Sequence, residues 1–99
     1  MSYPASKMSP DFNAFFAEQK RKITAHLKSI GCTEIKFDRG YYYFSAFFTN
    51  ATGQVYYLCS TDFRGDKERF YYRTAKDYQD YTGGSNNWSS FNNLKNIKL

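Results

Sequence analysis

Side chains able to do chemistry are few in this sequence and lie far apart. His26 is the only histidine, and a metal site or a Cys-His pair would need a second ligand or a base beside it, so we expect it on the surface or rim of a helix. Asp62 and Asp66 flank a Gly-containing turn, which is ordinary turn chemistry, whereas a hydrolytic acid pair needs an apolar pocket. The serines have no His or Lys base at hand. We therefore expect a protein that is not an enzyme, with no catalytic residues, no metal and no cofactor.

Two cysteines and a glycine pair are the other candidates for a chemical role. Cys32 and Cys59 are too few for a disulfide scaffold. We interpret both as reduced, half-buried residues of predicted strands, and a bridge between them would require neighbouring strands. Gly83 and Gly84 lack the Lys-Ser/Thr of a phosphate-binding loop. They are typical of a helix end followed by a polar loop, or of a place where backbone approaches a partner closely.

Aromatic residues interleaved with arginine have the most functional content. Ten Phe and ten Tyr raise the aromatic fraction to 21%. Tyrosines can stack on bases while neighbouring cations contact phosphates, but Tyr and Arg are also enriched at protein–protein hot spots. A third interpretation is that the tyrosines complete a two-sided core. The candidate partner-binding residues are Tyr41, Tyr43, Arg69, Tyr71 and Arg73 on the predicted sheet and Lys20 and Arg21 on the predicted helix.

The net charge of +5 is concentrated near the N-terminus. Residues 1–31 have five Lys or Arg against two acids, residues 32–73 have six against five, and residues 74–99 have three against two. A nearly neutral sheet favours a protein partner, and a basic helix face favours nucleic acid. Both interpretations stay open on the sequence alone.

A long amphipathic helix is predicted from Pro10 to Ile30, within a helical segment at residues 9–31. Ser9 can cap it, Pro10 suits its first position, and Gly31 is a natural stop. Residues 1–8 are expected to be a flexible lead-in without a signal peptide, and no apolar run approaches the length that spans a bilayer. We therefore expect a cytoplasmic protein that does not enter membranes, in the host cytoplasm if it is viral. The apolar stripe comprises Phe12, Phe15, Phe16, Ile23, Leu27 and Ile30, with Gln19 as its one gap.

Four strands with short connections are predicted at residues 32–73, and short connections require neighbouring strands to be antiparallel. Residues 74–81 read as a short helix, and 91–99 as a short helix or strand. The predicted fold is therefore a single α+β domain over residues 1–99. It has an N-terminal amphipathic helix on a four-stranded antiparallel meander, followed by a short C-terminal helix and tail. The predicted strands are Cys32–Asp38, Tyr41–Thr49, Gln54–Thr61 and Lys67–Arg73.

One helix covers only one face of a sheet, so side-chain alternation decides which residues face it. We expect the charged side of the fourth strand, with Arg69 and Arg73, to face water, and we expect something to cover part of the second face, because the third strand looks buried on both sides. The expected cover is the C-terminal segment with Trp88, Phe91, Leu94 and Ile97. The residues expected under the helix are Phe44, Phe48, Phe70 and Tyr72, and those expected on the second face are Tyr41, Tyr43, Phe47 and Tyr71.

The predicted order of helix, strands and helix resembles the double-stranded-RNA-binding domain in topology. That family places a basic run at the start of its last helix, whereas here only Lys76 stands among Asp77 and Asp80. We assign no family.

We expect a non-enzymatic module that binds a larger protein, as an inhibitor or an accessory subunit of an assembly. The Asn, Lys, Tyr and Phe content fits an AT-rich genome, and compact domains of this kind without a family are frequent among phages and mobile elements. The alternative is a single-stranded nucleic-acid binder that uses the sheet aromatics and basic residues.

Overall fold

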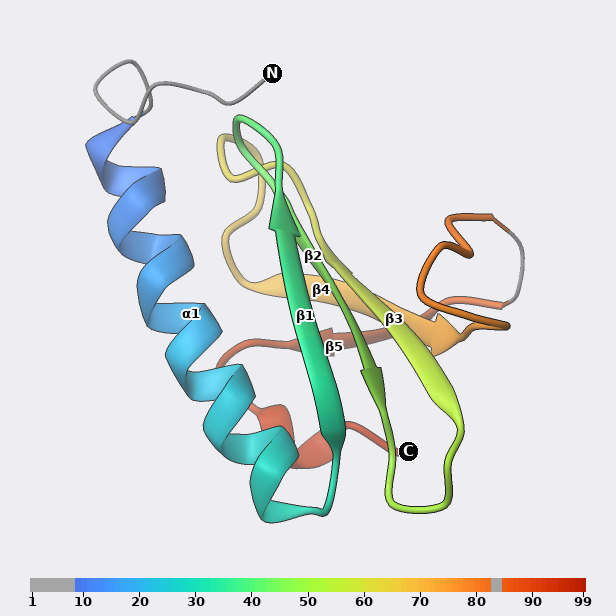
Figure 1. The fold of residues 1–99 in the computed structure, drawn as a ribbon. Helices are drawn as coiled ribbons and strands as arrows, with labels where there is room; N and C mark the ends of the chain where they lie inside the picture. Colours follow the sequence, from blue (N-terminus) through green and yellow to red (C-terminus); the bar gives the residue numbers. More distant parts are fainter. Residues whose placement is uncertain (1–8, 83–84) are drawn as a thin grey trace.

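The computed structural model describes residues 9–82 and 85–99, which form a helix and a five-stranded sheet (Figure 1). The strand order follows the chain order, β1-β2-β3-β4-β5, and every neighbouring pair is antiparallel. The predicted α+β class is confirmed, but the sheet has five strands rather than four. The predictions for residues 1–8 and for Gly83–Gly84 lie outside the described residues. The elements are α1 (Pro10–Ser29), β1 (Thr33–Arg39), β2 (Phe44–Thr49), β3 (Val55–Ser60), β4 (Arg69–Thr74), β5 (Asn87–Ser90) and the 3-10 helix η2 (Leu94–Asn96).

Helix α1 begins where the capping signals predict. The Ser9 hydroxyl accepts a hydrogen bond from the Phe12 N–H at 3.3 Å, and Pro10 is the first helical residue. The helix ends at Ser29, one residue earlier than predicted, and Gly31 follows with φ +89°. Ile30 therefore falls outside the apolar stripe and is 42% exposed.

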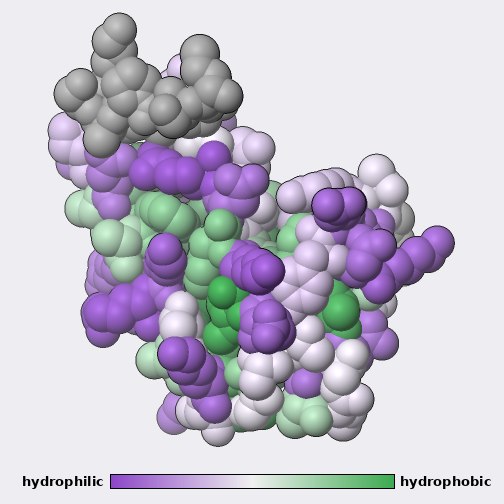
Figure 2. Space-filling model, in the orientation of Figure 1, coloured by the Kyte–Doolittle hydropathy of each residue, from purple (hydrophilic) through white to green (hydrophobic). Residues whose placement is uncertain are grey.

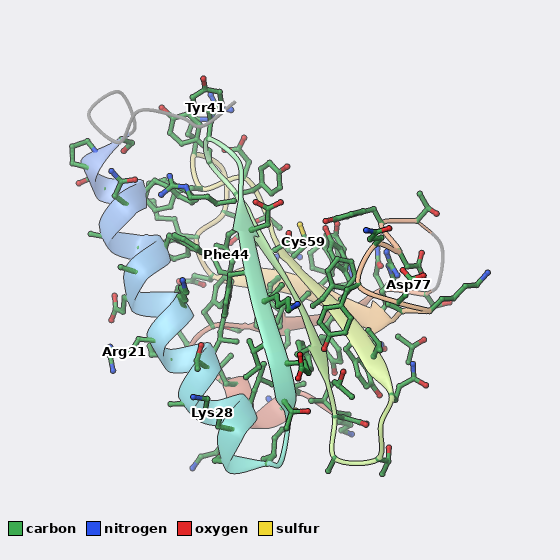
Figure 3. All side chains as sticks on the ribbon, viewed as in Figure 1. Arg21, Lys28, Tyr41, Phe44, Cys59 and Asp77 are labelled. Carbon is green, nitrogen blue, oxygen red and sulfur yellow. The ribbon has the colours of Figure 1, made fainter. Side chains whose placement is uncertain are left out.

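The helix-facing core is built on phenylalanine. Phe44 lies between α1 and the sheet, and its ring centroid is 5.1 Å from that of Phe16, 6.3 Å from that of Phe15 and 5.6 Å from that of Phe91 (Figure 3). Rings of this size bury large areas, so a small chain can form a core without disulfides. In Figure 2 apolar side chains show between the helix and the strands. The four residues predicted to lie under the helix are all confirmed as buried in this core, namely Phe44, Phe48, Phe70 and Tyr72.

We expected the C-terminal segment to cover the second face of the sheet, and this prediction is wrong. Phe91 and Ile97 are buried in the helix-facing core, and Leu94 packs against it. The reason is width, since five strands span about 19 Å whereas a helix is about 10 Å across. Residues 91–99 fill the part of the core that α1 leaves open, and η2 lies beside the lower half of α1 (Figure 1).

Residues 74–81 are not a helix, which corrects a second prediction. Thr74 is the last residue of β4, and it pairs with Tyr56. The Asp80 carboxylate accepts hydrogen bonds from the N–H groups of Lys76 and Thr82, at 3.0 and 3.3 Å. Asp77 likewise accepts from the Gln79 N–H at 2.8 Å. Aspartate side chains that bond nearby backbone in this way compete with helix formation and favour turns.

The two cysteines lie on opposite faces of the sheet. Cys32 is buried in the helix-facing core, just before β1, and Cys59 is buried on the other face of β3. Both thiols are free, and burial raises the pKa of Cys32. They are reduced as predicted, although they are buried rather than half-buried, and this geometry rules out a bridge between them.

Replacing Phe44 tests whether the helix-facing core holds the fold together. Phe44 is 0% exposed, so Phe44→Ala should lower the free energy of unfolding by about 3–5 kcal/mol. The measurement is chemical denaturation. Ile30→Ala is the control, because half-exposed Ile30 should change stability by only about 0.5 kcal/mol. Equal losses in the two variants would contradict this description of the core.

Candidate functional site

The face of the sheet that points away from α1, the second face, is formed by alternate residues of the strands. Ser45 of β2 pairs with Cys59 of β3, Cys59 pairs with Tyr71 of β4, and Tyr71 pairs with Trp88 of β5. Directly opposite residues on one face have Cβ atoms about 5 Å apart. The strands therefore place these four side chains in one row across the second face.

A loop, rather than the tail, covers part of the second face. Residues 75–82 stand on the side of the sheet away from α1, where Asp77 is labelled (Figure 3). The rings of Tyr78 and Tyr81 contact the Phe47 ring, with centroids 5.6 and 5.2 Å away. The hydroxyl groups of Tyr78 and Thr49 share a hydrogen bond of 2.7 Å. A second, smaller cluster results, in which Phe47, Tyr57, Cys59 and Ala75 are buried.

Arg73 does not face water, and the expectation that the charged side of β4 is open is wrong at this position. Arg73 is only 3% exposed. Its guanidinium donates to the Asp80 carbonyl at 2.7 Å, lies 3.6 Å from the Asp80 carboxylate and sits over the Tyr57 ring. A buried cation needs such partners, and the chain supplies them seven residues later. Arg73 therefore holds the covering loop and is not available to a binding partner.

The uncovered part of the second face presents a tryptophan held on two sides. Trp88 is 54% exposed, and its ring meets the Tyr71 ring edge to face at 5.5 Å. The Arg69 guanidinium lies 5.1 Å from the Trp88 ring, and its Nε donates to Asp66 Oδ2 at 2.7 Å. We call the three residues Arg69, Tyr71 and Trp88 the Trp88 patch. Its rings and its guanidinium are fixed by contacts within the chain.

Tyr71 links the Trp88 patch to the buried cluster below it. Burial, followed by a hydrogen bond with Cys59, raises the pKa of Tyr71 to about 12. The pKa of Tyr57 is raised as well, mainly by burial. Both hydroxyl groups thus stay protonated near neutral pH, and the patch offers neutral hydrogen-bonding groups beside its rings.

Tyr41 and Tyr43 lie apart from this patch, in the connection between β1 and β2. The predicted strand begins at Tyr41, but β2 starts only at Phe44. Both tyrosines are about half exposed, at 49% and 48%. The Tyr43 ring crosses Gly40 so closely that a Cβ on Gly40 would lie 2.2 Å from ring carbon Cε1. Tyr41 is at the end of the hairpin, well away from Cys59 (Figure 3).

Lys20 and Arg21 belong to the other layer of the molecule. Lys20 Nζ lies 5.9 Å from the Phe16 ring and 5.7 Å from the Phe37 ring. Arg21 is exposed and points away from the sheet (Figure 3).

Of the seven predicted residues, only Arg69 and Tyr71 therefore come together. Trp88 was missed as a site residue, because an apolar side chain between polar Asn87 and Ser89 is the pattern of a half-buried strand and gives no sign of exposure.

Comparisons with known proteins add no further constraint. No known protein family matches the chain, and neither a curated protein nor a solved structure is similar to it. In residues 9–82 and 85–99 no three His, Cys, Asp or Glu side chains gather in a way that could hold a metal ion. Over the same ranges no helix is both long and apolar enough to cross a bilayer.

Asp80→Asn tests the link between Arg73 and the covering loop. The hydrogen bond from the Lys76 N–H is the largest cause that lowers the pKa of the Asp80 carboxyl, and the Arg73 charge adds to it. A carboxyl group whose pKa is lowered in the folded state stabilises the fold at pH values above its ordinary pKa of 3.8. This stabilisation is lost as the pH falls through the folded-state pKa. The variant should therefore be less stable than the wild type at pH 7, and should lose less stability between about pH 5 and pH 2.

The measurement is the urea midpoint of both proteins at several pH values in this range. If the two midpoints agree at pH 7 and fall in parallel on acidification, the Asp80 carboxylate does not hold the loop.

Proposed function

We propose that this chain is a small non-enzymatic binding module that recognises another protein through the Trp88 patch. The observation that carries the proposal is the exposed, fixed ring of Trp88. Trp, Tyr and Arg are the residues most enriched at protein–protein hot spots, and the patch contains one of each. A module with one such patch suits an inhibitor or an accessory subunit of a larger assembly.

The contacts inside the patch favour binding because they reduce its entropic cost. Binding usually immobilises flexible side chains at about 0.5–1.5 kcal/mol each. Here Tyr71 and Arg69 already restrain the Trp88 ring, and Asp66 already restrains Arg69. A ring that served only the core would be buried, whereas more than half of the Trp88 surface faces solvent.

The charges around the patch favour protein over single-stranded nucleic acid. Arg69 is paired with Asp66, Arg64 with Asp62 and Arg73 with Asp80, so each guanidinium is already partly neutralised. A single-strand binding site needs stacking rings and free cations on the same surface. In this protein Lys20 and Arg21 lie on α1, in the layer on the other side of the sheet.

Trp88→Ala should weaken partner capture without unfolding the protein. Truncation of a hot-spot residue costs about 2 kcal/mol or more, so the captured amount of the specific partner should fall at least tenfold. Affinity capture from a native lysate of the producing cells, quantified for each bound protein, measures this. The melting temperature should change by only about 4–8 °C or less, because a small exposed contact is lost.

Tyr41→Ala is the matched control, since it removes an equally exposed aromatic ring from the hairpin. It should leave capture of the same protein unchanged. Equal loss of capture in both variants, or no protein that depends on Trp88, would rule out the Trp88 patch as the binding surface. Tight binding of single-stranded oligonucleotides that Trp88→Ala abolishes would instead establish the alternative function.

A further inference from the structure

All the excess positive charge of the described residues belongs to α1 and the C-terminal tail. Residues 10–29 contain four Lys or Arg and two acids, and residues 91–99 contain two Lys and no acid. Residues 30–90 contain seven basic and seven acidic side chains. Helix α1 and η2 are in contact, so the two basic segments form one side of the molecule. Figure 2 shows hydrophilic side chains along the outer side of α1.

No cation of α1 or of residues 91–99 forms an ion pair with another described residue. Three ion pairs occur in the described part of the protein, and all of them use arginines between β3 and the end of the covering loop. None involves a residue of α1 or of residues 91–99. Lysines without a carboxylate partner on neighbouring elements leave a positive potential that attracts anions.

A groove of about 400 Å³ runs between α1 and the tail, where the two basic segments meet. Lys22 and His26, one helical turn apart, line it from the helix, and Lys95 lines it from η2. Buried Phe91 and Ile97 hold the tail in place on either side of Lys95. The positive groups are therefore presented by anchored elements. The tail also contributes the amide side chains of Asn92 and Asn93 to the groove.

We propose that this groove binds the phosphate backbone of duplex nucleic acid. Duplexes carry one negative charge per about 1.7 Å of axis, which is twice the charge density of either strand counted alone. No exposed ring lines the groove to stack on an unpaired base, since Phe91 is buried and the exposed Tyr and Trp of the described residues lie elsewhere. The expected binding is insensitive to sequence and sensitive to salt. It uses a surface separate from the Trp88 patch.

Fluorescence anisotropy with a short labelled DNA duplex, the matching RNA duplex and the single strand tests the proposal. One phosphate contact from each groove lysine predicts that the affinity for a duplex falls about 12-fold between 50 and 200 mM salt. Lys22→Gln with Lys95→Gln should weaken duplex binding at least tenfold at low salt and reduce the salt slope by about two contacts.

Lys67→Gln with Lys76→Gln is the matched control, because it removes two exposed cations from the sheet side. It should leave duplex affinity within about threefold of the wild type, and Trp88→Ala should leave it unchanged. If the groove variant proves unfolded by circular dichroism, Lys95→Gln alone, which changes an exposed side chain, gives the same comparison with a loss of one contact.

Four results would overturn the proposal. They are an absence of duplex binding at low salt, equal weakening by the two double variants, tighter binding to the single strand than to either duplex, and binding of polyglutamate but of no duplex. The last result would assign the groove to an acidic protein. The first, second and fourth results leave the Trp88 patch untouched, and in the third Trp88→Ala tells whether the patch or the groove holds the single strand.

Discussion

The width of the sheet is the constraint on which the rest of this structure depends. Both of its faces carry aromatic side chains, but the described chain has one long helix, and a helix covers only about half the span of five strands. The remaining apolar surface must be buried by segments without long regular structure. On the helix-facing side the tail supplies Phe91 and Ile97, and Lys98 donates its N–H to the Tyr72 hydroxyl at 3.0 Å.

The second face is covered only in part, and a buried cation decides which part. Arg73 ties the covering loop to the sheet through the carbonyl and the carboxylate of Asp80. The tyrosines of this loop then lie over Phe47 and Tyr57, and β5 is left at the edge with Trp88 uncovered. The Trp88 patch, the surface proposed for protein recognition, is thus the part of the second face that the short loop of residues 75–82 does not cover.

The net charge differs between the two sides of the molecule. Residues 30–90 contain equal numbers of basic and acidic side chains, and three of their arginines pair with nearby aspartates, whereas α1 and the tail have an excess of basic side chains. The exposed Trp88 ring and the groove lysines Lys22 and Lys95 consequently occupy different surfaces. This separation favours two distinct binding surfaces over a single one that would combine stacking with phosphate contacts.

Much of the local structure follows from residues that are close together in the sequence. The cap at Ser9, the helical spacing of Phe12, Ile23 and Leu27, and the alternation in β2 and β4 depend on residues a few positions apart, so they could be read before the fold was known. Which segment covers which face, the burial of Arg73 and the exposure of Trp88 could not be predicted in this way. These outcomes depend on contacts between elements, such as Phe91 against Phe44 or the 75–82 loop over β3, and no local pattern records them. The helix predicted for residues 74–81 did not form for a related reason. The carboxylates of Asp77 and Asp80 accept hydrogen bonds from nearby backbone N–H groups, and these bonds replace the N–H to carbonyl bonds of a helix.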